Sequence, residues 1–216
     1  MTTDSRQVRL SNPLIFSAKN KSRRLSWVRA GAWLFTQRTW IPVPLALALL
    51  VLPPESASRV PLAVGTVIVI CAELLRLWAV RHIGVISRTR SDRLGPLVAT
   101  GPFAVVRNPL YLANIALWTG FALAARLTWL VPVFIAVLGV EYHAIVRWEE
   151  GLLEARRGED YGAYVARVPR WMPSFRTGRP AAAHPQHPWR DTLFSERGTL
   201  IAIAVGYVLL WLKTRM

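Results

Sequence analysis

The fold of this chain follows from residues 110–146, LYLANIALWTGFALAARLTWLVPVFIAVLGVEYHAIV, which contain two apolar runs, 110–125 and 128–146. Each run approaches the roughly 20 apolar residues that a helix needs to cross a bilayer core of about 30 Å. Only Arg126 and Leu127 lie between the two runs. Because two residues leave room for little more than a turn, the sequence predicts a tight hairpin of two membrane helices.

Three further apolar runs flank the hairpin, at 39–52, 60–80 and 198–212, and residues 30–35 extend the first of them. The composition agrees with a membrane protein, since 53% of the 216 residues are apolar and 18% are charged. A typical soluble domain has about 25% charged residues. We therefore predict an all-α integral membrane helical bundle of about five transmembrane helices.

The positive charge of the chain is distributed unevenly along it. There are 27 Lys and Arg against 12 Asp and Glu, a formal net charge of +15. Eight basic residues precede residue 39, five lie in 81–107 and nine in 147–197, so 22 of the 27 fall on one side of a five-helix topology. Cytoplasmic loops carry such an excess of Lys and Arg, whereas a nucleic-acid-binding protein gathers its Arg on one folded face. We therefore expect a cytoplasmic N-terminus and no nucleic-acid partner.

The sequence divides into four parts. We expect a basic tail with interfacial aromatic residues (1–38), a membrane core (39–173), a Pro-rich linker (174–197) and a C-terminal transmembrane helix (198–216). The single Cys excludes an intramolecular disulfide framework and a Cys-rich zinc site, and we predict no metal ligands. The number of copies in the assembly is left open.

The first stretch that points to chemistry is LVATGPFAVVRNPLY, residues 97–111. Asn108 followed by Pro109 is typical of a helix start, with Asn as the N-cap and Pro at the first helical position. Such a start offers backbone N–H groups and a partial positive charge to a carboxylate. Capping alone explains Asn108, and Tyr111 alone is more often an interfacial aromatic residue than a ligand contact.

The second stretch is EYHAIVRWEEGLLEARRGEDYGAYVARVPRWMP, residues 141–173. Glu141 and His143 lie in an apolar run, and ionisable groups inside a membrane are functional candidates by default. Helical spacing places Glu141 and Glu149 on one stripe, with His143, Arg147 and Glu150 on the neighbouring one. The alternative is that Glu149 and Glu150 merely pair with Arg side chains on a hydrated face. From residue 147 onward we predict a charged helix that leaves the membrane and breaks near Gly158.

Together, the two stretches resemble the isoprenylcysteine carboxyl methyltransferase and phospholipid methyltransferase group of integral membrane enzymes. The resemblance covers roughly residues 80–173, and the order and spacing of its motifs are more specific than any motif alone. The matching positions are Leu97-Val98, Gly101, Arg107-Asn108-Pro109-Leu110-Tyr111, Glu149-Glu150, Tyr161, Tyr164 and Arg167-Val168-Pro169.

The resemblance implies a methyltransferase that takes its methyl group from S-adenosylmethionine in a cytoplasmic-facing pocket closed by loops and a C-terminal helix. The implied acceptor is a lipid or a small hydrophobic molecule with a carboxylate, amine, hydroxyl or thiol. The residues implied to bind the cofactor are Gly95, Pro96, Leu97, Val98, Phe103, Asn108, Pro109, Leu110, Tyr111 and Glu149. The candidate catalytic residues are Glu150, Arg147, His143 and Glu141, and the candidate substrate-binding residues are Arg167 and Arg170.

Three positions depart from the family pattern. Asn108 stands where the family often has His, and Phe103 stands where Tyr is common. Ile145 stands where the prenylcysteine enzymes have an Arg that meets the substrate carboxylate, which argues against a prenylcysteine substrate bound in the same manner. Two alternatives remain open: an NADPH-dependent membrane reductase related to sterol reductases, and a non-catalytic membrane scaffold.

Overall fold

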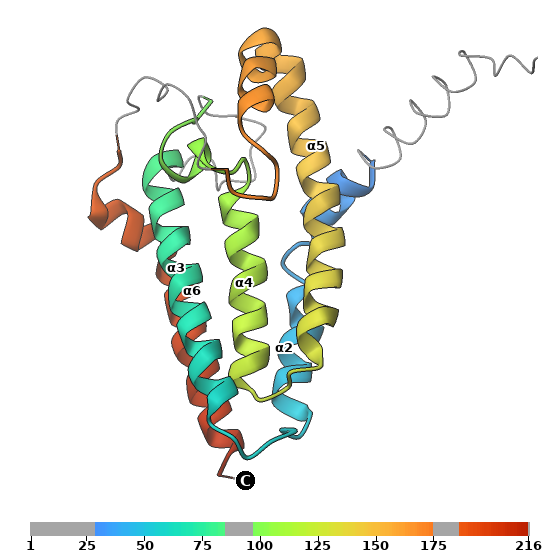
Figure 1. Ribbon diagram of the computed structural model, residues 1–216, viewed down its shortest axis with the longest axis vertical. Coiled ribbons are helices and arrows are strands. Elements are labelled where there is room, and N and C mark those ends of the chain that lie inside the picture. The colour runs from blue at the N-terminus through green and yellow to red at the C-terminus, as the bar shows by residue number, and fades with distance from the viewer. Residues whose placement is uncertain (1–28, 85–96, 175–185, 216) are drawn as a thin grey trace, which may run out of the picture.

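The computed structural model describes residues 29–84, 97–174 and 186–215. These residues form a bundle of helices and contain no strand, so the predicted all-α class is confirmed (Figure 1). A first helix, Arg29–Gln37, precedes the labelled elements. They are α2 (Pro42–Val51), α3 (Val60–Ile83), the short 3₁₀ helix η2 (Gly101–Ala104), α4 (Pro109–Ala124), α5 (Leu130–Arg167) and α6 (Trp189–Lys213).

Three helices of the described residues, α3, α5 and α6, are long and apolar enough to cross a membrane. The first helix and α2 pass the same test together, with a bend of 52° between them, and would make a fourth span. The predicted number of five is reached only if α4 is added. At 16 residues, α4 is shorter than the roughly 20 residues that a bilayer core requires.

The predicted hairpin is present, as α4 and α5 joined by a tight turn. Arg126 has a φ of 59° at this turn, and the Leu127 N–H donates to the Ala122 carbonyl oxygen at 2.9 Å. Pro109 stands at the first position of α4, as predicted. The turn of the hairpin defines one end of the bundle, and the candidate site lies at the other end.

Helices α3 and α4 approach each other closely because both carry glycine where they cross. A Cβ atom added at Gly65 would lie 2.4 Å from the Gly120 carbonyl oxygen. Small residues allow such close packing inside a membrane, where apolar side chains gain nothing by leaving lipid for protein.

We therefore expect Gly65→Ala to destabilise the bundle by about 1–3 kcal/mol, the usual effect of overpacking. The matched control is Gly139→Ala on α5, because a Cβ atom there meets nothing within 4 Å. Thermal unfolding in detergent measures both variants. Equal midpoints for the two variants would contradict the close α3–α4 contact.

Helix α5 continues past the membrane and then folds back. The residues before its break, 130–157, span about 42 Å at about 1.5 Å per residue, which exceeds the bilayer core of about 30 Å. The helix breaks at Gly158, whose φ of 48° is non-helical, at the predicted position. The chain beyond the break returns toward the start of α4 (Figure 1), where the Arg107 N–H donates to the Pro169 carbonyl oxygen at 2.9 Å.

The last helix, α6, begins at Trp189 rather than near Gly198. Its first turns, residues 189–197, therefore lie within the segment predicted as a linker, of which residues 175–185 lie outside the described ranges. Pro188 precedes the helix and Asp191 stands in its first turn, both of which suit a helix start. The Thr192 hydroxyl donates to the Pro188 carbonyl oxygen at 3.1 Å. Helix α6 then runs along α3 (Figure 1).

Candidate active site

The candidate site lies where the start of α4, the loop before it and the returning end of α5 meet. A hydrogen bond joins the two helices here: the Tyr111 hydroxyl of α4 donates to Glu149 Oε1 of α5 at 2.8 Å. The Tyr111 ring also packs on the Tyr142 ring, with centroids 4.9 Å apart. The carboxylate of Glu149 is therefore held in one orientation by a phenol whose own ring is fixed by a neighbour.

Glu150 faces a different set of partners. Its carboxylate lies 2.9 Å from Arg107 Nη1, and Arg170 donates to both of its oxygens, through Nε at 3.0 Å and Nη2 at 2.5 Å. The Glu150 side chain is 13% exposed, and those of Arg107 and Arg170 are 11% and 24% exposed. This ion cluster binds the loop before α4 and the segment after α5 to the same point on α5.

Asn108 occupies the predicted N-cap position, but its side chain makes no capping hydrogen bond. The capping prediction was therefore wrong for the side chain. Its Nδ2 group donates instead to the Arg170 carbonyl oxygen at 3.3 Å. The reason is tertiary, because the returning chain places a carbonyl beside Asn108. The side chain thus leaves the N–H groups at the start of α4 uncapped.

The loop residues form an apolar wall beside this helix start. Val98 and Phe103 are buried and pack with Ala79 of α3 and with Leu110, while Leu97 packs on Tyr161, Tyr164 and Val168. The Tyr164 hydroxyl donates to the Phe103 carbonyl oxygen at 2.8 Å. Burial raises the pKa of the Tyr164 phenol, so the phenol stays protonated and keeps this bond. Gly95 and Pro96, also expected in the cofactor pocket, lie outside the described residues.

The remaining predicted residues are spread along α5. His143 lies within electrostatic reach of Arg147, Arg170 and Glu150, so it belongs to the edge of the site. Arg167 is exposed, and its Nε donates to the Ala163 carbonyl oxygen of its own helix at 3.1 Å.

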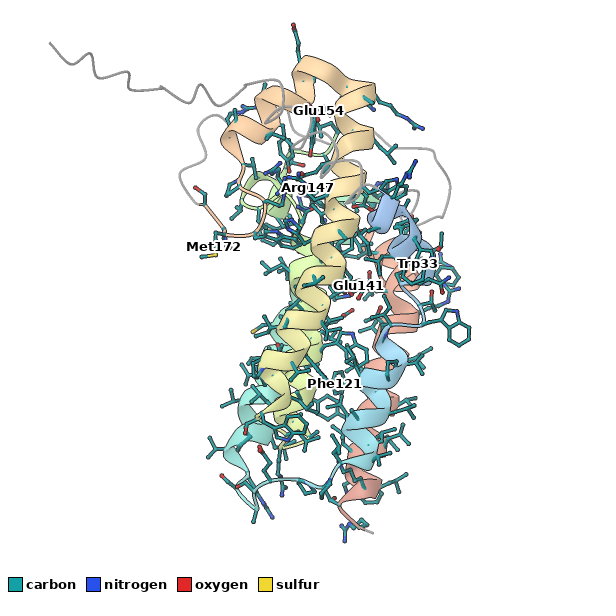
Figure 2. The ribbon with its side chains drawn as sticks, turned by 90° about the vertical axis from the view of Figure 1, so that its right-hand side faces the viewer. Trp33, Phe121, Glu141, Arg147, Glu154 and Met172 are labelled. Atoms are coloured by element: carbon teal, nitrogen blue, oxygen red, sulfur yellow. The ribbon has the colours of Figure 1, made fainter. Side chains whose placement is uncertain are left out.

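Glu141 is apart from this group. It precedes Glu149 by two helical turns, or about 12 Å along the axis, and Figure 2 shows it farther from the site end than Arg147. Its side chain is 3% exposed, and neither carboxylate oxygen has a hydrogen-bond partner among the described residues.

A buried charged cluster that was not predicted from the sequence lies in the interior of the bundle. Arg76 of α3 lies 3.3 Å from Glu73 and 2.8 Å from Glu196 of α6. The side chains of Asn114 and Thr199 accept further hydrogen bonds from Arg76. The i,i+3 spacing of Glu73 and Arg76 inside an apolar run was the signal that could have found the cluster.

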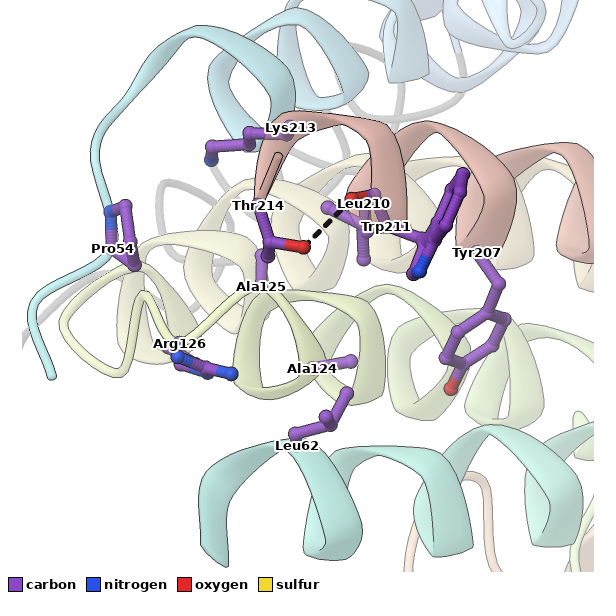
Figure 3. Close-up of a pocket in the computed structure, with 10 residues that line it drawn as sticks. All are labelled: Pro54, Leu62, Ala124, Ala125, Arg126, Tyr207, Leu210, Trp211, Lys213 and Thr214. Atoms are coloured by element: carbon purple, nitrogen blue, oxygen red, sulfur yellow. Dashed lines mark hydrogen bonds between the residues drawn. The ribbon is translucent and has the colours of Figure 1, made fainter. Parts of the chain in front are cut away.

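A cavity of about 380 Å³ lies at the opposite end of the bundle (Figure 3). It is lined mainly by apolar side chains of α3, α4 and α6, with Arg126 and Lys213 as its charged residues. Neither Glu149 nor Glu150 reaches it. Among the described residues, no group of three or more His, Cys, Asp or Glu is arranged to hold a metal ion.

Two comparisons with known proteins find a match, one to a single relative and one to a family. The chain is 28% identical over 130 residues to the nickel-cobalt-cadmium resistance protein NccN of Alcaligenes xylosoxydans xylosoxydans, a match that covers 60% of this chain and 58% of that protein. The chain therefore spans less than two thirds of the length of this relative. No solved structure matches the chain.

Residues 60–159 match the family model of the phospholipid methyltransferases. The match contains α3, α4 and α5 up to its break, and with them Arg107, Tyr111, Glu149 and Glu150. It ends before Arg170 and α6. The resemblance drawn from the sequence is thereby confirmed: residues 60–159, a little under half of the chain, are similar to the phospholipid methyltransferase family.

Proposed function

We propose that the chain transfers a methyl group from S-adenosylmethionine to a lipid or small hydrophobic acceptor. The observation that carries the proposal is the Tyr111–Glu149 hydrogen bond at the start of α4, inside the segment that matches the methyltransferase family. An oriented carboxylate beside a helix start with an uncapped first turn suits a ligand that carries both an ammonium and a carboxylate.

The residues at the site fit this donor. Glu149 would hold its ammonium or a ribose hydroxyl, and the N–H groups at the start of α4 would receive its carboxylate. Leu97, and the wall behind it that contains Phe103, would face the adenine. When bound, the sulfonium supplies a methyl group that is already activated, so the protein mainly aligns the acceptor and excludes water.

The ion cluster changes the role we assign to Glu150. Because two Arg side chains neutralise it, we propose that Glu150 closes the site rather than acting as a base. Arg170 is already paired with Glu150 in this cluster. Arg147 is therefore the better candidate to hold an anionic head group at the membrane surface. For an amine or hydroxyl acceptor, His143 at the site edge remains the proposed base. Glu141, two helical turns from Glu149, is no longer assigned this role.

The basic residues also support an orientation. We propose that the site end faces the cytoplasm, where the excess of Lys and Arg lies. The soluble donor would enter from that side, and a lipid acceptor would enter laterally from the bilayer.

Isothermal calorimetry on detergent-purified protein tests the donor. We expect saturable heat with S-adenosylmethionine and with its demethylated product, and none with NADPH. Heat with NADPH alone would instead support the reductase alternative, and the absence of heat with any of the three would contradict the proposal.

Membranes that contain the protein, incubated with a donor labelled in its methyl group, identify the acceptor. We expect label in the lipid extract that is lost with Glu149→Ala. Label that persists at the wild-type level in this variant would contradict the role proposed for Glu149. Equal label in membranes that lack the protein would show that another enzyme of the membrane made the product.

A further inference from the structure

The buried charged cluster ties α6 to the family-matched core. Glu73, Arg76 and Glu196 are 6%, 6% and 0% exposed, and they meet in the interior of the bundle. Charged groups inside a membrane bundle are costly and point to function rather than to stability. The start of α6 is held to the end of α3 as well, because the His187 N–H donates to the Arg81 carbonyl oxygen at 2.9 Å.

The contacts of Arg76 continue across the bundle toward the candidate site. Its Nη1 group donates to Asn114 Oδ1 of α4, and the Asn114 side chain lies beside the Tyr142 hydroxyl of α5. The Tyr142 ring packs on the Tyr111 ring, 4.9 Å between centroids. Tyr111 in turn donates to Glu149 at 2.8 Å. One unbroken series of side-chain contacts thus leads from α6 to the carboxylate assigned to the donor.

We propose that Glu196 is a positioning residue for the methyl donor. By fixing Arg76, it fixes Asn114 and the pair of tyrosine rings, and so sets the orientation of Glu149. The inference rests on the proposed function, because donor binding is its readout. It makes the donor pocket of this chain dependent on a helix that lies outside the family-matched residues 60–159.

The competing explanation is that the ion pair only joins α3 to α6. A purely structural ion pair lowers stability when it is broken, but it has no reason to act through Asn114. The two explanations therefore differ in whether the effect of Glu196 on the donor requires Asn114.

The first experiment measures the Kd of S-adenosylmethionine by calorimetry on the full-length protein in detergent. We expect Glu196→Gln to raise this Kd at least about fivefold, the lower end of typical coupling between separate sites. The matched control is Asp191→Asn, which removes an exposed carboxylate from the same helix and is expected to leave the Kd unchanged. An unchanged Kd in Glu196→Gln would overturn the inference.

A double-mutant cycle with Asn114→Ala separates positioning from stability. We expect Asn114→Ala alone to raise the Kd while the ion pair to Glu196 remains. In that background, Glu196→Gln should have no further effect on the Kd, yet should still lower the thermal midpoint. Independent effects of the two substitutions on the Kd would overturn the inference.

The negative results of these experiments can be distinguished from one another. If Glu196→Gln does not fold, Asn114→Ala alone still decides, since a wild-type Kd in that variant would overturn the inference. Wild-type protein that binds no donor would overturn the inference together with the proposed function. Wild-type protein that binds, with both variants equal to it, would overturn the inference alone.

Discussion

Glu149→Ala is expected to raise the Kd of S-adenosylmethionine at least about tenfold above that of the wild type. A hydrogen bond to a charged group contributes about 1.5–3 kcal/mol, and each 1.4 kcal/mol is a factor of ten in affinity. The substitution also leaves the Tyr111 hydroxyl without the oxygen to which it donates at 2.8 Å. Calorimetry on the purified variant measures the loss.

The matched control for this prediction is Glu154→Ala. Glu154 is exposed and lies farther along the same helix (Figure 2). Its removal should leave the Kd within about twofold of the wild type, which is the experimental error expected for the Kd. Tyr111→Phe should give an intermediate Kd, because Glu149 keeps its carboxyl group but loses the bond that orients it. Equal, small effects of Glu149→Ala and Glu154→Ala would remove Glu149 from the donor site.

Features set by local chemistry could be predicted from the sequence. The separator Arg126-Leu127 was enough to predict the hairpin of α4 and α5. Gly158 was enough to predict the break of α5, because a charged helix beyond the bilayer has little packing to hold it straight. The position of Asn108 before Pro109 was enough to predict where α4 begins.

Features set by distant contacts could not be predicted in the same way. The side chain of Asn108 bonds to the Arg170 carbonyl, 62 residues away, and Arg76 pairs with Glu196, 120 residues away. Periodicity contains no information about such partners. The prolines of residues 174–197 favoured a linker over this whole segment. All of them precede Trp189, the first residue of α6, so the helix begins earlier than predicted.

Glu149 and Glu150 also show the difference between what local sequence predicts and what distant contacts decide. For both Glu149 and Glu150, the sequence left two interpretations: a functional role, or pairing with nearby Arg side chains. The structure separates them, since Glu149 accepts from a tyrosine of α4 whereas Glu150 pairs with Arg107 and Arg170. A rotation of 100° between successive helical residues places them toward different neighbours, and only the packing of α4 decides which neighbour each one meets.

Glu150→Ala is expected to lower the free energy of unfolding by about 3 kcal/mol, the lower end of the cost of removing one partner from a buried ion pair. Its carboxylate is the anion that holds Arg107 and Arg170 at 2.9 Å and 2.5 Å. Without it, two guanidinium groups with little access to water face each other uncompensated. The returning end of α5 should therefore detach from the loop before α4. Thermal unfolding in detergent and limited proteolysis after residue 158 measure the two consequences.

The prediction is specific because the cluster contains two cations, Arg107 and Arg170, and one anion, Glu150. Arg170→Met leaves a neutral Arg107–Glu150 pair, so it should cost clearly less than Glu150→Ala. Added salt should raise the midpoint of Glu150→Ala more than that of Arg170→Met, since salt screens the repulsion between the two remaining cations. The control Glu159→Ala, at an exposed position beyond the break, should leave the midpoint near that of the wild type. If Arg170→Met cost as much as Glu150→Ala, the contribution would lie in the packing of the Arg170 side chain and not in the charge of Glu150.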